Sequence, residues 1–332
     1  MMRAMRVFVT RRLPEAAMAR LEKASEPSLD LDVWEGDEPP PPDVLHARVR
    51  GVDGIVCLLT DAIDEALLAA AGDTLRVVSQ MAVGVDNIDL AACAARGVAV
   101  GHTPGVLSES TADLTLALML ATCRRVVEAA EDVRAGRWRS WSPLGWAGVD
   151  LYGATVGIVG LGRIGQAVAR RLAGFNVTLL YSSRRALTKI GTLAVERVPL
   201  DELFERADIV SLHVPLTDET RGLVGEAALA RMKRTAILIN TARGEIVDQA
   251  ALLAALDKGH IAAAGLDVTT PEPLPADHPL LARRDVVVLP HIGSASRRTR
   301  QRMADIAVDN LLAGLRGAPM QSPPPPATPE QG

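Results

Sequence analysis

The feature of the sequence that most constrains the fold is the run VGIVGLGRIGQAVARRL, residues 156–172, whose glycines have the spacing GxGxxG. An apolar, β-branched stretch at 155–159 leads into the glycines, and a helical pattern at 164–173 follows them. This order is typical of the first strand-to-helix turn of a dinucleotide-binding domain, where glycines permit a tight turn, close approach of the pyrophosphate and close helix–strand packing. We therefore expect a dinucleotide at the helix N-terminus, in contact with Gly160, Gly162 and Gly165.

Short apolar runs alternate with helical patterns on both sides of this turn, which predicts an α/β protein with two doubly wound parallel sheets. One long helix is predicted over 109–135. A last helical pattern, 296–315, is long enough to return from the second series of strands to the first. We therefore predict a Rossmann coenzyme domain (104–296) inserted in a flavodoxin-like substrate domain (1–103 and 297–318). The proline-rich tail, 319–332, is predicted to be disordered.

The composition is that of an ordinary soluble globular protein, with 48% apolar residues, 23% charged residues and a net charge of −4. The charges are spread along the chain, so we expect neither a nucleic-acid nor a membrane partner. The three cysteines lie far apart and form no CxxC pair. This pattern argues against a metal site and fits a reducing compartment, so a cytoplasmic protein is expected.

The strand after the glycine turn is predicted to end in Ser182-Ser183-Arg184-Arg185. NAD-binding domains usually place an acidic residue here, on the 2′-hydroxyl of the adenosine ribose. A carboxylate would repel a 2′-phosphate, whereas guanidinium and hydroxyl groups can bind one. We therefore predict NADPH as the cofactor, with Ser183, Arg184 and Arg185 at its 2′-phosphate; the alternative is that both arginines are merely solvated.

Three segments near the ends of later predicted strands carry the residue types that reduction of a ketone requires. His291 can give a proton to the alkoxide, and the carboxylate of Glu272 would favour its charged form. Arg243 can bind a substrate carboxylate through two N–H groups and polarise the adjacent carbonyl. Singly, each residue has an ordinary structural explanation, but their order behind the glycine turn favours catalysis. The other histidines lack such a setting, although His213, with Val214 and Pro215, is expected to line the cofactor site.

The chain resembles the D-isomer-specific 2-hydroxyacid dehydrogenases over nearly its whole length. The resemblance rests on the glycine turn, N-x-x-R-G at 240–244, E-P at 272–273 and P-H-x-G at 290–293, in this order. The likeness is greatest to members that reduce glyoxylate and hydroxypyruvate, as in TPGVLSESTADLTLALMLATCRR and IAAAGLDVTTPEPLP. It implies NADPH-dependent reduction of these acids to glycolate and D-glycerate. The segment 181–197 departs from the family pattern.

The resemblance also implies roles for individual residues. His291 would be the acid/base, Glu272 its carboxylate partner and Arg243 the anchor of the substrate carboxylate. The backbone amides of Val83 and Gly84, in MAVGVDNID, would bind that carboxylate from the substrate domain. Further positions implied near the substrate are Leu59 and Ser294, and those implied near the cofactor are Gly162, Arg163, Ile164, Val214, Pro215, Thr241, Asp267 and Gly293.

Three of the four tryptophans, Trp138, Trp141 and Trp146, fall within nine residues of a predicted loop. Tryptophan is enriched at interface centres, so the functional interpretation is an oligomer contact. The alternative is that these side chains pack beneath their own domain, which we expect for one or two of them. The resemblance implies a homodimer that forms through the coenzyme domains, in which Trp141 reaches the partner's active site and narrows the substrate pocket.

Three other functions stay open at this point. A 2-ketogluconate reductase or another D-2-hydroxyacid dehydrogenase would use the same three catalytic residues. A nucleotide-sensing scaffold of the corepressor type keeps the fold and these residues but binds peptides. Turnover of glyoxylate with NADPH would separate an enzyme from a scaffold.

Overall fold

The computed structural model describes residues 3–187, 189–191 and 193–324 and divides the chain into two compact units. Unit 1 comprises Met1–Leu107 and Ala295–Gly332, and unit 2 comprises Ser108–Ser294. The sequence predicted these boundaries after residues 103 and 296. The assignment of substrate binding to one unit and coenzyme binding to the other remains a prediction.

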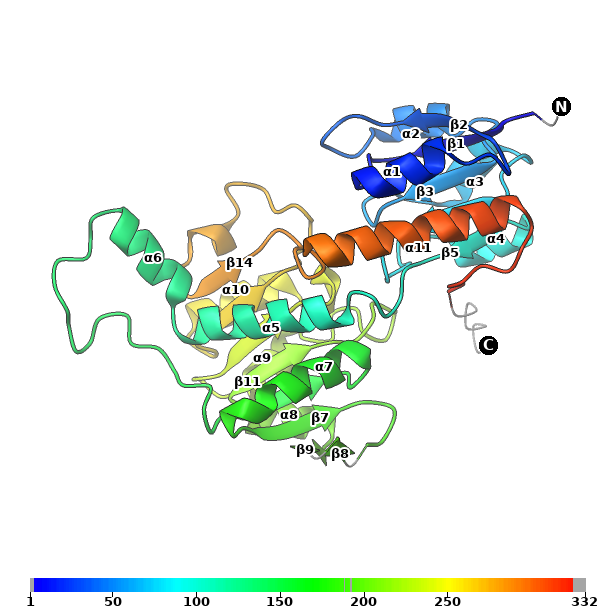
Figure 1. Ribbon diagram of the computed structural model, residues 1–332. Helices are drawn as coiled ribbons and strands as arrows, with labels where there is room; N and C mark the ends of the chain where they lie inside the picture. Colours follow the sequence, from blue (N-terminus) through cyan, green and yellow to red (C-terminus); the bar gives the residue numbers. More distant parts are fainter. Residues whose placement is uncertain (1–2, 188, 192, 325–332) are drawn as a thin grey trace. The chain divides into compact units, whose positions relative to one another are not determined.

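Unit 1 is built on a five-stranded parallel sheet of order β2-β1-β3-β4-β5, the order of flavodoxin-like folds. Helices α1 and α11 cover one face, and α2, α3 and α4 cover the other (Figure 1). The elements of unit 1 are β1 (Met5–Val9), α1 (Glu15–Glu22), β2 (Leu29–Val33), α2 (Pro42–Arg48), β3 (Gly54–Cys57), α3 (Glu65–Ala71), β4 (Val77–Gln80), α4 (Leu90–Ala95), β5 (Ala99–Gly101) and α11 (Arg297–Leu315).

Helix α11 joins the end of the chain to the sheet formed by its beginning. Ser296 caps the helix by accepting a hydrogen bond from the Thr299 N–H. Two glycines let helix and strands approach closely: a Cβ on Gly101 would lie 2.6 Å from Asn310, and one on Gly314 would lie 2.5 Å from Val77. The segment after α11 is hydrogen-bonded to the loop that follows β5, because the backbone N–H of His102 donates to the Ser322 carbonyl at 3.0 Å. The predicted disorder from residue 319 therefore differs from the structure at Ser322, and residues 325–332 lie outside the described part.

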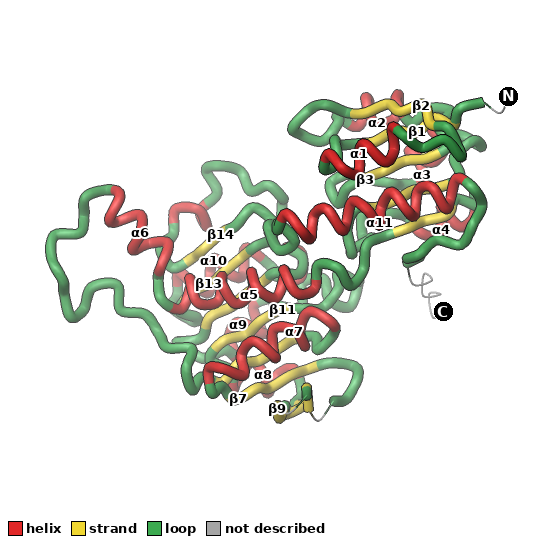
Figure 2. Tube along the Cα trace, viewed as in Figure 1, coloured by secondary structure: helices red, strands yellow, loops and turns green. Residues whose placement is uncertain are grey.

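Unit 2 contains a seven-stranded parallel sheet of order β10-β7-β6-β11-β12-β13-β14, in which the strand order reverses between β6 and β11. Helices α5 and α7 pack on one face, and α8, α9 and α10 pack on the other (Figures 1 and 2). The elements of unit 2 are α5 (Ser108–Cys123), α6 (Val126–Arg134), β6 (Thr155–Val159), α7 (Arg163–Leu172), η1 (Ala173–Phe175), β7 (Thr178–Ser182), β8 (Lys189–Ile190), β9 (Leu193–Ala194), β10 (Glu196–Arg197), α8 (Leu200–Arg206), β11 (Ile209–Leu212), α9 (Glu226–Arg231), β12 (Ile237–Asn240), η2 (Gly244–Ile246), α10 (Gln249–Asp257), β13 (Ala263–Leu266), η3 (Pro279–Ala282) and β14 (Val286–Val288).

The single long helix predicted over 109–135 is wrong, because the chain forms two helices there. Helix α5 ends at Cys123, and Arg125 adopts a left-handed conformation with φ of 53° before α6 begins at Val126. A right-handed helix cannot continue through that conformation. Helix α6 and the loop 135–150 therefore extend away from the body of unit 2 (Figure 1), and we call this segment, residues 126–150, the arm.

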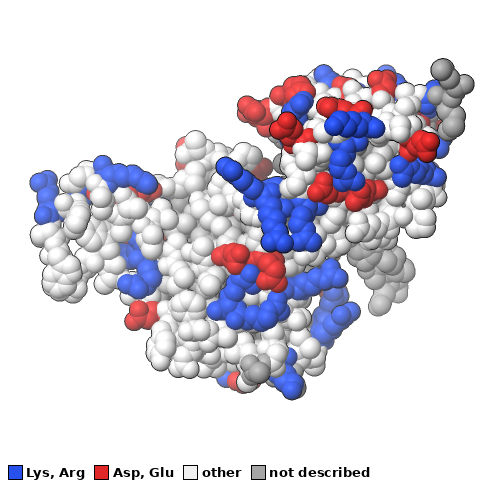
Figure 3. Space-filling model, in the orientation of Figure 1, with Lys and Arg blue, Asp and Glu red and all other residues white. Residues whose placement is uncertain are grey.

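Several charged side chains on the surface form ion pairs. On the exposed side of α5 and α7, Arg171 lies 2.6 Å from Asp113 and 2.8 Å from Glu109, and the cluster of both signs is visible in Figure 3. Within the residues described, no helix is long and apolar enough to cross a membrane.

Candidate active site

The glycine turn after β6 has a backbone that larger residues could not adopt. Gly160 has φ of 95°, and a Cβ there would lie 2.7 Å from the backbone of His213. A Cβ on Gly165 would lie 2.2 Å from the Gly160 carbonyl oxygen, so this glycine lets α7 pack closely on β6. Gly162 caps α7 and has open space where its Cβ would stand.

The position and charge of this turn fit the pyrophosphate of a dinucleotide. It lies at the carboxyl end of β6, next to the point where the strand order reverses, which is where open α/β sheets bind ligands. Helix α7 has no acidic residue in its first turn and no side chain that caps its N-terminus. Its first N–H groups and the positive end of its dipole are thus available to an anion.

The loop after β7 carries the residues predicted to bind a 2′-phosphate. Arg184 and Arg185 are exposed and Ser183 is half-buried. The Tyr181 hydroxyl closes the loop, because it donates to the Leu187 carbonyl at 2.5 Å and accepts from the Leu187 N–H at 2.6 Å. Arg197, in the neighbouring strand β10, donates to the Ser183 carbonyl at 3.0 Å. The sequence did not indicate these two supports, since both depend on contacts across the loop.

The structure brings two of the predicted catalytic residues into contact. His291 Nδ1 lies 2.5 Å from Glu272 Oε1, and both side chains are partly exposed. Because a carboxylate only accepts hydrogen bonds, Nδ1 carries the hydrogen and Nε2 is left for another partner. His291 has φ of 51°, in the left-handed region.

Arg243, the third predicted catalytic residue, follows β12, and Thr241 lies two residues before it. The Asn240 side chain donates to the Arg243 carbonyl at 2.8 Å, which fixes the turn after the strand. Thr241 Oγ1 shares a hydrogen bond of 2.9 Å with Thr115 Oγ1 on α5.

Asp267 holds the backbone that follows His291. Its carboxylate is buried and accepts the N–H groups of Ile292 and Gly293, each at 2.8 Å, through its two oxygens. Burial raises the pKa of Asp267, an effect that these two hydrogen bonds oppose. The His291 N–H also donates to the Asp267 carbonyl at 2.9 Å. In addition to its expected place beside the cofactor, Asp267 is therefore a clamp on the His291 loop.

His213 follows β11 directly and lies against the glycine turn. Its Nε2 is 2.9 Å from Ser211 Oγ, and burial lowers the pKa of His213 to about 4. A ring with such a pKa is neutral near pH 7. This agrees with the expectation that His213 lines the cofactor site and does not donate a proton in the reaction. Val214 and Pro215 continue the same loop.

Three further residues of unit 2 were predicted to lie near the cofactor or the substrate. Of these, Arg163 is exposed, whereas Ile164 and Ser294 are half-buried.

Within unit 1, the predicted substrate residues lie at one edge of the sheet. Leu59 follows β3, Val83 and Gly84 follow β4, and these two strands are neighbours. Asn87 connects the two loops, because its Nδ2 donates to the Leu58 carbonyl at 3.1 Å and to the Asp61 carbonyl at 2.8 Å.

The arm carries exposed apolar side chains. Trp141 is 81% exposed and Trp138 is 60% exposed, whereas Trp146 donates from Nε1 to Asp132 Oδ2 at 2.7 Å. Among the described residues, the indole of Trp146 is the one of these three that forms a hydrogen bond within its own unit, and the exposed indoles of Trp138 and Trp141 can reach another surface.

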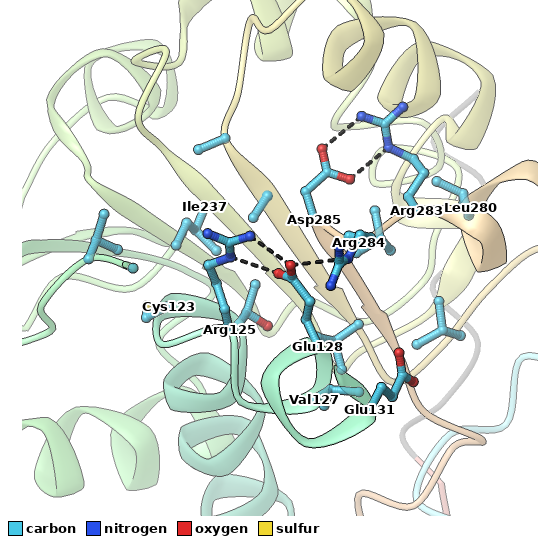
Figure 4. Close-up of a pocket in the computed structure, with 18 of the residues that line it drawn as sticks. Cys123, Arg125, Val127, Glu128, Glu131, Ile237, Leu280, Arg283, Arg284 and Asp285 are labelled. Carbon is cyan, nitrogen blue, oxygen red and sulfur yellow. Dashed lines mark hydrogen bonds and ion pairs between the residues drawn. The ribbon is translucent and has the colours of Figure 1, made fainter. Parts of the chain in front are cut away.

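A cavity of about 580 Å³ lies beneath the arm, between α6 and β14 (Figure 4). Glu128 points into it and pairs with Arg125 at 2.7 Å and with Arg284 at 3.1 Å. Its floor includes Ile237 and Ala263, the amino-terminal residues of β12 and β13. The cavity is therefore at the opposite end of the sheet from the glycine turn and is not the candidate active site. In the described ranges, no cluster of three or more metal-ligating side chains occurs.

Comparison with known proteins agrees with this geometry. The family model for the D-isomer specific 2-hydroxyacid dehydrogenase, NAD binding domain, matches residues 116–293. A glyoxylate reductase from Korarchaeum cryptofilum is 52% identical, with 94% of this chain and 93% of that protein covered. The human glyoxylate reductase/hydroxypyruvate reductase is 48% identical over 96% of this chain and 98% of its own. A crystal structure of an NADPH-dependent glyoxylate/hydroxypyruvate reductase from Sinorhizobium meliloti, in complex with NADP and malonate, has a TM-score of 0.82 at 34% identity and covers 98% of this chain and 99% of that one.

Proposed function

The chain belongs to the D-isomer specific 2-hydroxyacid dehydrogenase family, and we propose that within it the protein is an NADPH-dependent reductase of glyoxylate and hydroxypyruvate. The observation that carries the proposal is the hydrogen-bonded pair of His291 and Glu272 in the unit that also contains the glycine turn. Two relatives support the choice of substrates: the Korarchaeum cryptofilum protein is a glyoxylate reductase, and the human protein is a glyoxylate reductase/hydroxypyruvate reductase.

In the proposed reaction, the glycine turn would hold the dinucleotide, which would be the source of the hydride that the carbonyl carbon of the 2-oxo acid receives. His291 donates a proton from Nε2 to the carbonyl oxygen, because Nδ1 is occupied by Glu272. The Glu272 carboxylate stabilises the imidazolium before the transfer, and Asp267 holds the His291 loop through the amides of Ile292 and Gly293. The guanidinium of Arg243 pairs with the substrate carboxylate and polarises its carbonyl.

The proposed preference for NADPH rests on the loop after β7. Ser183, Arg184 and Arg185 stand where an NAD-binding domain has a carboxylate, and hydrogen bonds from Tyr181 and Arg197 support the backbone of this loop. Support that exists before binding reduces the entropy lost when the loop binds phosphate. The Sinorhizobium meliloti relative in complex with NADP supports the same preference.

Steady-state kinetics with NADPH and NADH, against a panel of 2-oxo acids, tests both parts of the proposal. We expect glyoxylate and hydroxypyruvate to have the highest kcat/KM and NADPH to be the better cofactor. Changing Arg184 and Arg185 to Ala should raise KM for NADPH far more than KM for NADH, and Arg163→Ala, which alters a different cofactor contact, is the control. Equal efficiency of NADPH and NADH in the unaltered protein would refute the preference.

We also propose a homodimer that forms through unit 2, with the arm at the contact. Exposure of two indoles on one loop is costly in water and typical of an interface. In this arrangement Trp141 narrows the substrate pocket of the partner. The three cysteines are free and buried, which supports the proposal of a reducing, cytoplasmic compartment.

A further inference from the structure

We propose that His102 is a positioning residue, which orients the backbone amides of Val83 and Gly84 toward the carboxylate of the substrate. This inference rests on the proposed function, because it concerns the group that binds a 2-oxo acid. His102 follows β5 and is 7% exposed, and its Nδ1 lies 2.9 Å from the Val83 carbonyl oxygen. A carbonyl only accepts hydrogen bonds, so the ring must carry its hydrogen on Nδ1.

The loop after β4 is held by its carbonyl groups, one after another. The Ala82 carbonyl accepts the Thr103 N–H at 2.9 Å, and the Val83 carbonyl accepts from His102. The next carbonyl, that of Gly84, accepts from the Gln80 side chain at 3.0 Å. Each of these three successive peptide groups is thereby fixed through its carbonyl oxygen.

A fixed carbonyl also fixes the amide of the next residue. In a planar trans peptide the C=O and N–H groups point in opposite directions. The hydrogen bond from His102 to the Val83 carbonyl therefore points the Gly84 N–H away from His102. The hydrogen bond from the Thr103 N–H to the Ala82 carbonyl likewise points the Val83 N–H away from Thr103. Neither of these amides donates a hydrogen bond to any other described residue. Successive amides that point outward from a loop form a concave site for an anion.

The ring of His102 is placed firmly enough to act in this way. Its backbone N–H donates to the Ser322 carbonyl at 3.0 Å, and its carbonyl accepts from the Asn310 side chain at 3.0 Å. Asn310 also accepts the Ser322 N–H at 3.2 Å. Helix α11 and the segment after it thus fix the N–H and the carbonyl of His102. The hydrogen bond from its ring then fixes the orientation of the Val83–Gly84 peptide.

The test compares His102→Leu, which removes the donor, with His102→Asn, whose Nδ2 can replace Nδ1. His46→Leu, on helix α2, is the matched control. Binding of oxalate to the NADPH-loaded protein is measured by calorimetry, and KM and kcat are measured with glyoxylate. We expect His102→Leu to weaken oxalate binding and raise KM for glyoxylate about tenfold, because the misplaced amides would lose a hydrogen bond to the charged carboxylate. KM for NADPH should stay unchanged, and His102→Asn should recover most of the loss.

The outcomes separate this inference from the proposed function. Equal oxalate affinity in the unaltered protein and in His102→Leu would overturn the inference, as would failure of the unaltered protein to bind oxalate. A loss that His102→Asn does not recover, or that His46→Leu shares, would also overturn it. A protein that binds oxalate with the expected dependence on His102, but reduces no 2-oxo acid, would refute the proposed function and leave the role of His102 standing.

Discussion

The stability of unit 2 should depend on pH through His213, and the size of the effect follows from its burial. The folded protein keeps this ring neutral, because burial lowers the pKa of His213 from 6.5 to about 4. An unfolded chain binds a proton at His213 below about pH 6.5, whereas the folded chain does so only near pH 4. Between these values the unfolded state binds more protons, so the free energy of unfolding falls as the pH is lowered through this window.

The magnitude can be worked out for the step from pH 7 to pH 5. The free energy of unfolding falls by about 1.36 kcal/mol for each pH unit below the unfolded-state pKa of roughly 6.5. Over the roughly 1.5 units down to pH 5, this gives a loss of about 2 kcal/mol. This figure is an upper limit, because His213 is only half-buried. The loss should be complete below about pH 4.

Urea unfolding, followed by circular dichroism at pH 7 and pH 5, measures the effect. We compare the unaltered protein with His213→Gln, whose amide can still bond to Ser211 but does not titrate, and with His260→Gln as a control at another histidine of unit 2. The unaltered protein and the control should lose about 2 kcal/mol more than His213→Gln between the two pH values. The same loss in all three proteins would refute the reasoning, whatever their absolute stabilities.

Two further predictions concern the chemistry and the arm. Glu272→Gln removes the negative charge beside His291, so kcat for the reduction of glyoxylate at pH 7 should fall by about tenfold; a kcat equal to that of the unaltered protein would contradict the pairing. Trp141→Ala should change the ratio of kcat/KM for glyoxylate and a bulky 2-oxo acid by about tenfold while KM for NADPH stays the same. Light scattering should show a dimer, and a fully active monomer, or an unchanged substrate profile in Trp141→Ala, would refute this role.

Sequence patterns predict the parts of the structure that depend on neighbours along the chain. The glycine turn is one of these, because spacing and flanking elements together specify the close contact of Gly165 with Gly160. The alternation of strands and helices likewise predicts two parallel sheets. The break between α5 and α6 was missed, because nothing in the residue type of Arg125 indicates a positive φ.

The remaining features depend on residues far apart in the sequence. The clamp of Asp267 on the loop at 292–293 exists because β13 ends beside that loop. The role proposed for His102 depends on the pairing of β4 with β5, and no pattern in the sequence around this histidine indicated a function. The composition of the tail predicts disorder at Ser322, but the side chain of Asn310 binds its backbone.

The most direct test of the central claim is the consumption of NADPH with glyoxylate by the unaltered protein and by His291→Ala. The account predicts that the unaltered protein oxidises one NADPH for each glycolate formed. It also predicts that His291→Ala lowers kcat by about 10²–10⁴-fold, the usual contribution of a positioned acid, while the Kd for NADPH, measured by fluorescence titration, stays the same. Absence of glyoxylate-dependent NADPH oxidation in the unaltered protein, or undiminished turnover in His291→Ala, would contradict the account.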